Sequence, residues 1–158
     1  MTRALSCVGT SVPRGDAIEK VTGSARYAHD LALPGMLHAA LVTSPHASAR
    51  IVRVDVADAA ALPGVRAVLA GANLDVRLGL YMRDKRILAQ DVVRYQGEPV
   101  VAVAADTLDI AREACRRVHV EYEPTRAVFD PRDAMKSGAP LVHPELSSYA
   151  HLEGVFFP

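Results

Sequence analysis

Residues 97–124 read GEPVVAVAADTLDIAREACRRVHVEYEP, and this stretch decides the fold. Its segment 100–105 is apolar on both faces, which predicts an interior strand covered on each side. Residues 118–123 alternate strictly between apolar and polar, which predicts a half-buried strand that Pro124 ends. A helix is expected between them, from Thr107 to about 117. This strand–helix–strand order leaves space for one βαβ-like crossover.

The expected helix over 107–117 has signals at both ends. Asp106 is placed to cap its free amides, with Asp109 as a weak capping-box partner. Glu113 can pair with Arg116 and Arg117, and cations in the last turn suit the helix dipole. One apolar stripe runs along it: Leu108, Ala111, Cys115 and Val118. These features predict an amphipathic helix packed on a sheet.

A second strand and a short helix are predicted earlier in the chain. In residues 51–56 the valines at 52, 54 and 56 fall on one face of a strand. A short helix over about 57–62 follows Asp55 or Asp58 and ends at Pro63-Gly64. The tetrapeptide ALPG occurs at both 32–35 and 61–64, where its glycine can take the positive φ of a type II turn. We therefore expect a mixed-sheet α+β domain with one longer and one shorter helix.

Composition and charge exclude several classes of protein. The 158 residues are 50% apolar and 23% charged, enough for one domain with a real core. The 18 Lys and Arg residues balance 18 Asp and Glu residues, so no net basic charge marks a nucleic-acid binder. The longest apolar run is too short to span a bilayer, and residues 1–8 do not form a signal peptide. A cytoplasmic protein with neither nucleic acid nor membrane as partner is expected.

The cysteines and histidines do not form a metal-binding motif. Cys7 and Cys115 lie far apart with no CxxC pair, which leaves one long-range disulfide open but excludes a zinc ribbon. The six histidines make no HxH, HxxxH or HExxH pattern, and His119 is expected to be solvated. Ser44 and His46 are close in sequence, although triad members normally converge from distant segments.

Other candidate motifs also have ordinary structural explanations. Glu121 and Glu123 share one strand face, which favours a solvated edge over a catalytic pair. Residues 83–86, RDKR, form a mixed-charge loop too short and balanced for a nucleic-acid patch. No glycine pattern matches GxGxxG or a phosphate loop. Residue chemistry alone therefore predicts an α+β domain without a visible active site.

Three blocks in order resemble the large subunits of molybdenum hydroxylases, the xanthine dehydrogenase and aldehyde oxidase family. The first block is RGDAIEKVTGSARY at 14–27, closing with Asp30. The second consists of LPGMLHA at 33–39 and SPHASARI at 44–51. The third is LAQDVVRYQGEPV at 88–100, followed by AADT at 104–107 and VEYE at 120–123. Their order and spacing are similar to the family's α/β hammerhead domain over about residues 8 to 145.

The resemblance implies an oxidoreductase that hydroxylates aldehydes or N-heterocycles and carries molybdopterin, 2Fe-2S clusters and FAD when assembled. In such enzymes the cofactor supplies the difficult chemistry. The family's molybdopterin contacts and base glutamate lie after the hammerhead domain, and no position here matches them. The resemblance thus implies no catalytic, cofactor-binding or metal residue in this chain, which alone should bind no cofactor and be inactive.

The resemblance divides the chain into three parts: an N-terminal extension over 1–13, the hammerhead domain over 14–130, and an irregular tail over 131–158. The tail would lead toward cofactor-binding domains that this sequence does not contain. The expected partners are a cofactor-bearing molybdopterin domain or subunit and the iron–sulfur and flavin subunits.

Four polar residues of the first block are candidates for the interface with those partners: Arg14, Asp16, Lys20 and Thr22. Loop-stabilising hydrogen bonds explain the same residues equally well. The alternative function is a stand-alone protein-binding or scaffold module that kept the fold without the enzyme.

Overall fold

The structure is a computed structural model that describes residues 8–9, 11–79 and 84–144. Cys7, Arg83 and the last residues of the expected tail lie outside the described residues. The chain divides into two units, Met1–Met36 and Leu37–Pro158. The second unit contains the sheets and the core.

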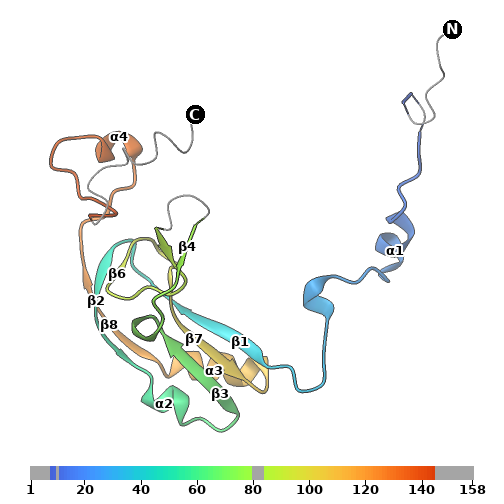
Figure 1. Cartoon of the computed structure of the whole chain (residues 1–158), viewed down its shortest axis with the longest axis horizontal. Coiled ribbons are helices and arrows are strands. Elements are labelled where there is room, and N and C mark those ends of the chain that lie inside the picture. The colour runs from blue at the N-terminus through green and yellow to red at the C-terminus, as the bar shows by residue number, and fades with distance from the viewer. Residues whose placement is uncertain (1–7, 10, 80–83, 145–158) are drawn as a thin grey trace. The chain divides into compact units, whose positions relative to one another are not determined.

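The first sheet is built around the apolar run that the sequence places inside. Strand β7 (Pro99–Ala105) lies between β1 (His38–Thr43) and β3 (Val65–Ala70), and both pairs are antiparallel (Figure 1). The predicted interior position of this strand is confirmed, but the expected cover on both faces is not, because Ala102 and Ala104 on one face are only half-buried.

The second sheet has the order β6-β2-β8, with β2 (Ala49–Asp55) between β6 (Val92–Val93) and β8 (His119–Pro124). The predicted alternation of β8 is confirmed, because Val120 and Tyr122 face the core.

The predicted alternation of β2 is wrong at one residue. The pairing of β2 with β8 skips Val52, so this residue forms a bulge and its side chain is 50% exposed. Ile51 packs against the core in its place, since the extra residue shifts the period of two, while Val54 and Val56 pack against the core as predicted. A bulge depends on the partner strand, which the local pattern does not contain.

The longer helix is α3 (Leu108–Arg116), close to its predicted bounds. Its N-cap is Thr107, whose side chain accepts a hydrogen bond from the Ile110 amide, so the expected cap Asp106 is wrong. The Asp106 carboxylate instead binds the guanidinium of Arg66 on β3 at 2.7 and 2.9 Å.

The C-terminal part of α3 agrees better with the sequence-based prediction. The predicted pairs of Glu113 with Arg116 and Arg117 are confirmed, at 3.0 and 3.1 Å. Ala111 and Ala114 are its buried residues, so the buried stripe is shifted toward alanine and away from Leu108. Small side chains let the helix lie close to the sheet.

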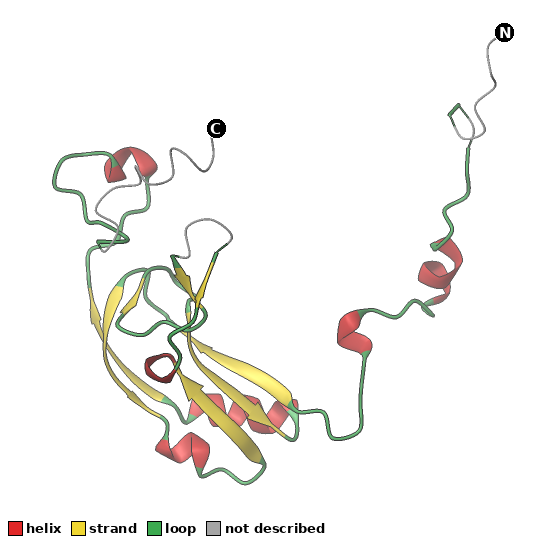
Figure 2. Cartoon of the chain, in the orientation of Figure 1, coloured by secondary structure: helices red, strands yellow, loops and turns green. Residues whose placement is uncertain are grey.

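The strand–helix–strand unit does not form a parallel crossover. Strands β7 and β8 belong to different sheets, with α3 between them in the chain, and every strand pair in the described residues is antiparallel. Helix α3 contacts β1 and β7, and it crosses behind these strands in Figure 2. The α+β class is confirmed, while the sheets of the described residues are antiparallel and not mixed.

The short predicted helix is α2 (Ala57–Ala60), shorter than the expected 57–62. The Asp55 carboxylate accepts a hydrogen bond from the Ala57 amide at 3.1 Å. At the following turn Gly64 has a φ of 88°, as the ALPG motif requires.

The core lies between the two sheets, α2 and α3. Its fully buried valines are Val93, Val100, Val101 and Val103, and most of the other buried apolar residues are alanines. Val100 and Val101 are adjacent and both fully buried, at the point where the register of β7 with β1 shifts by one residue.

Small elements complete the described chain. They are α1 (Ala17–Thr22), η1 (Ala28–Asp30), η2 (Gly71–Asn73), β4 (Arg77–Leu78), β5 (Lys85–Arg86) and α4 (Pro131–Ala134). Helix α4 lies in the expected irregular tail, and the sequence reasoning missed it. Its signals are Asp130, whose carboxylate accepts from the Arg132 amide, and Pro131 at the first helical position.

Candidate functional site

The N-terminal unit brings three of the four interface candidates together. Asp16 contacts the guanidinium of Arg14 and the ammonium of Lys20, the latter at 2.6 Å. Hydrogen bonds from Arg14 and Lys20 lower the pKa of the Asp16 carboxyl below its usual value. These charges stabilise the first turn of α1 and leave all three side chains accessible to solvent.

Thr22, the fourth candidate, is used within the same helix. Its hydroxyl donates to the Ile18 carbonyl at 2.7 Å, four residues earlier. All four residues thus make contacts within α1 or at its N-terminal turn. The interface role stays a prediction.

Helix α1 exposes apolar side chains that sequence reasoning did not single out. None of its six residues is buried, and Ile18 and Val21 are 74% and 83% exposed. An isolated helix of this length is marginal in water, since nucleation outweighs so few hydrogen bonds.

The Ser44–His46 pair is structural. The buried Ser44 hydroxyl donates to the His46 carbonyl and accepts from the His46 amide, both at 3.0 Å. The His46 ring packs edge-on against Tyr122, with centroids 5.1 Å apart. A turn that uses the hydroxyl in this way does not orient it toward the imidazole.

The remaining strand candidates are solvated, as predicted. His119, Glu121 and Glu123 are exposed on β8, and Glu123 pairs with Arg50 of the adjacent β2. The two glutamates therefore do not form a shielded pair of carboxylates.

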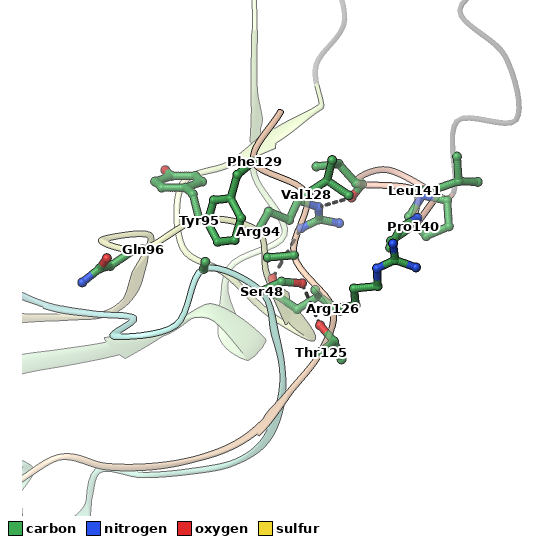
Figure 3. Close-up of a pocket in the computed structure, with 15 residues that line it drawn as sticks. Ser48, Arg94, Tyr95, Gln96, Thr125, Arg126, Val128, Phe129, Pro140 and Leu141 are labelled. Carbon is green, nitrogen blue, oxygen red and sulfur yellow. Dashed lines mark hydrogen bonds between the residues drawn. The ribbon is translucent and has the colours of Figure 1, made fainter. Parts of the chain in front are cut away.

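A second candidate site is a groove of about 480 Å³ (Figure 3). It lies where the start of β2 and the end of β8 meet the segment leading to α4. Three segments line it, within 47–48, 92–96 and 125–144. The apolar part of the lining is Ala47, Val92, Tyr95, Ala127, Val128, Phe129, Pro140, Leu141, Val142 and Pro144.

Most polar groups of the groove are already bound to one another. Ser48 and Thr125 share a hydrogen bond of 2.7 Å between their hydroxyls. Arg94 donates to the carbonyl of Val142 at 3.0 Å and so joins β6 to the later segment. Arg126, by contrast, has no ion pair among the described residues. The groove is suited to an apolar group or peptide segment.

Sequence reasoning missed this groove. Its residues come from three separate segments, and the irregular composition after 125 gave no periodic pattern. The available signal was the recurrence of apolar residues at 127–129 and 140–142 in a stretch otherwise rich in polar residues.

In residues 8–9, 11–79 and 84–144, no three His, Cys, Asp or Glu side chains are grouped to bind a metal ion. No helix of the described chain has the length and hydropathy needed to cross a membrane.

The domain has an α+β fold with two small antiparallel three-stranded sheets and a helix packed on one of them. The described residues of its groove form no catalytic arrangement, so the domain offers contact surfaces. The family described as aldehyde oxidase and xanthine dehydrogenase, α/β hammerhead domain, matches residues 22–126. The chain belongs to this family, as the three sequence blocks predicted.

The relatives that this chain matches are much longer than it is. It is 34% identical to the nicotinate dehydrogenase large molybdopterin subunit of Eubacterium barkeri, over 97% of this chain and 37% of that protein. It is 37% identical to the carbon monoxide dehydrogenase large chain of Afipia carboxidovorans, over 90% of this chain and 18% of that one. The chain thus spans less than two-fifths of these relatives.

Solved structures agree with the sequence comparison. A Cu,Mo-containing CO dehydrogenase matches with a TM-score of 0.82 and 36% identity, over 89% of this chain and 18% of that one. Quinoline 2-oxidoreductase from Pseudomonas putida 86 matches with a TM-score of 0.74 and 41% identity, over 83% and 18% of the two chains. The predicted hammerhead fold is confirmed.

Proposed function

We propose that this chain is the hammerhead portion, or a split subunit, of a cytoplasmic molybdopterin-dependent oxidoreductase that hydroxylates aldehydes or N-heterocycles. Its role is structural: it packs against the cofactor-bearing part and contributes to assembly. The observation that carries this proposal is the match of almost the whole chain to a small part of molybdenum-enzyme large subunits.

The polar groups of the groove do not fit molybdopterin. A phosphorylated pterin needs several converging N–H donors for its phosphate. In the groove, Arg94 is committed to the Val142 carbonyl and Ser48 to Thr125, which leaves Arg126 as a cation without an ion pair in the described chain. We therefore assign the cofactor to the partner, together with the 2Fe-2S clusters and FAD of the assembled enzyme.

The N-terminal unit is the first surface that we assign to the partner. Arg14, Asp16, Lys20 and Thr22 shape α1, while Ile18 and Val21 expose apolar area that costs free energy in water. A partner that covers the two apolar side chains and meets the adjacent charges would stabilise this short helix.

Co-purification tests the proposed function. The affinity-tagged full chain is expressed with the reading frames adjacent to its gene, purified, and analysed for molybdenum by mass spectrometry. We expect a partner of molybdenum-enzyme sequence and roughly one molybdenum per chain. If no molybdenum-containing protein is retained, the subunit proposal is wrong and the stand-alone scaffold module replaces it.

A charge-reversal pair tests the N-terminal contact in the same experiment. Arg14→Glu with Lys20→Glu should lower the retained molybdenum about threefold or more, because like charges would then surround Asp16 and destabilise the helix that is assigned to the contact. Arg132→Glu with Lys136→Glu, which changes two exposed cations near α4, serves as the matched control. Equal loss in both variants would show a general charge effect and contradict the contact.

A further inference from the structure

One face of the first sheet is apolar and open to solvent. It consists of six residues, two on each strand: Ala39 and Leu41 on β1, Ala102 and Ala104 on β7, and Ala67 and Leu69 on β3. The side chains of Leu41 and Leu69 are 52% and 37% exposed, although leucine is usually buried. We call these six residues the outer face.

The strand register gives the outer face its shape. Leu41 and Leu69 are both paired with Ala102, one from each side, and Ala39 and Ala67 are both paired with Ala104. Directly paired side chains stand on the same face of a sheet. The alanines of β7 therefore form a low central strip, and the two leucines rise beside it.

The opposite face is already covered. Val101, Val103 and Ala105 alternate with the outer-face alanines along β7, and all three are buried. Helix α3 contacts β1 and β7 on this covered side (Figures 1 and 2). The central strand β7 carries only apolar residues on both of its faces, which is typical of a strand covered on both sides.

The dimensions of the outer face suit an α-helix. Neighbouring strands lie about 4.8 Å apart, so the leucines of β1 and β3 stand roughly 10 Å from one another. A helix with its side chains is about 10–12 Å wide. It can lie along β7 over Ala102 and Ala104 with the leucines against its flanks. Since the six outer-face residues are uncharged, the matching helix surface must be apolar.

We propose that an apolar helix face from the molybdopterin-bearing part of the enzyme covers the outer face. This inference rests on the proposed function and names the surface through which assembly occurs. The length of the relatives supports this occupant: about four-fifths of the carbon monoxide dehydrogenase large chain lies outside the matched region and in the same polypeptide. A segment tethered in this way meets the sheet at high effective concentration.

Co-purification of a surface variant tests the inference. Leu41→Lys with Leu69→Lys places two charges beside the alanine strip, and should reduce molybdenum retained per tagged full-length chain about tenfold or more. The control is Val52→Lys, which changes an apolar side chain of similar exposure on the second sheet and should retain molybdenum. Circular dichroism and a urea titration establish that each variant is folded.

A labelling measurement gives an answer even if the double variant does not fold. The chain carrying Ala39→Cys reacts with a maleimide when purified alone, and the parent chain supplies the background from its own cysteines. In the molybdenum-containing complex we expect the rate at this cysteine to fall about tenfold or more. An unchanged rate in the complex, or retention of molybdenum by a folded Leu41→Lys, Leu69→Lys variant, would overturn the inference.

The outcomes separate the inference from the proposed function. If the unmodified chain retains no molybdenum-containing partner, the proposed function itself fails. If it retains the partner while the outer face stays reactive, only the inference fails. If light scattering shows that the chain alone is a dimer and that Leu41→Lys with Leu69→Lys makes it monomeric, a second copy is the occupant and the inference is wrong.

Discussion

Glu98 is a buried carboxylate in the turn before β7, and it holds that turn together. Its side chain accepts a hydrogen bond from the Arg94 amide, and its carbonyl accepts from the Ser44 amide at 2.9 Å. The sequence did not indicate that this charged residue would be buried. Such a carboxylate is tolerated because its hydrogen bond offsets part of the cost of leaving water.

Removing this acceptor should destabilise the protein. Glu98→Ala leaves the Arg94 amide without its acceptor, and we expect the free energy of unfolding to fall by about 1–3 kcal/mol. Glu98→Gln retains an oxygen at this place and should lose less. Urea denaturation measures both. Glu121→Ala, at an exposed position, should change stability by no more than about 0.5 kcal/mol; a similar loss there would contradict the explanation.

For Tyr122, removing the polar atom is not expected to lower the free energy of unfolding. Its hydroxyl is buried without a hydrogen-bond partner among the described residues, and the neighbouring Ser44 hydroxyl is engaged by His46. Burial raises the pKa of the Tyr122 phenol above its usual value, with Ser44 opposing this in part. The ring itself packs against the core and against His46.

Tyr122→Phe should therefore leave stability unchanged or raise it by up to about 1 kcal/mol, because it removes an unsatisfied polar atom and keeps the ring. Thermal and urea unfolding measure the difference. Tyr95→Phe, at a position exposed to solvent, should have no effect. A loss of more than about 1 kcal/mol in Tyr122→Phe would show that the hydroxyl has a partner.

At the scale of elements, two adjacent residues at the start of α3 have different roles, although the side chains of both could cap the helix. Thr107 caps the helix, and Asp106 pairs with Arg66 of β3. Thr107→Ala should cost about 1 kcal/mol, whereas Thr107→Ser keeps the capping oxygen and should cost little. Urea denaturation of the two variants checks this. If alanine and serine have equal effects, the threonine does not act as the cap.

The Arg66–Asp106 pair gives stability a dependence on pH. The hydrogen bond from Arg66, followed by its charge, lowers the pKa of the Asp106 carboxyl below 3.8. The contribution is present above the unfolded-state pKa, near 3.9, and is lost as the pH falls through the lower folded value. Arg66→Gln should therefore flatten the acid side of the stability curve below about pH 4.

Unfolding free energies measured across the acid range test this pH dependence. Because the pair is exposed, we expect the effect to be small and to shrink at high salt. Arg126→Gln removes a cation that has no ion pair in the described chain, and it should keep the slope of the parent protein. An equal change in slope for both variants would exclude a specific role for the pair.

For the whole molecule, the burial pattern predicts that stability resides in the second unit. Every buried apolar residue of the described chain lies between Ala49 and Val118, and α1 contributes none. Deleting residues 1–36 should change the free energy of unfolding by less than about 1 kcal/mol. The same deletion should reduce the molybdenum retained in co-purification, because it removes the proposed N-terminal contact.

Denaturation in urea and co-purification together check the deletion. A shorter chain that unfolds at a clearly lower urea concentration would show that the N-terminal unit supports the core. If the shorter chain still retains the full molybdenum content, the assignment of α1 to the partner contact is wrong.

The sequence by itself determined the elements whose signals lie within a few residues. The apolar run of β7, the alternation of β8 and the ion pairs of Glu113 in α3 were all predictable, because strand and helix periods act over short distances. The three family blocks likewise predicted the hammerhead fold, and the family match confirms it.

Only the tertiary structure decided features that depend on pairing between distant segments. Val52 forms a bulge because of the register between β2 and β8. Asp106 does not cap α3 because it pairs with Arg66, which lies 40 positions away in sequence but beside it in space. The groove depends in the same way on contacts such as Ser48 with Thr125, 77 positions apart. A local pattern contains no information about such partners, so the outer face of the sheet could be found only once the three strands were aligned.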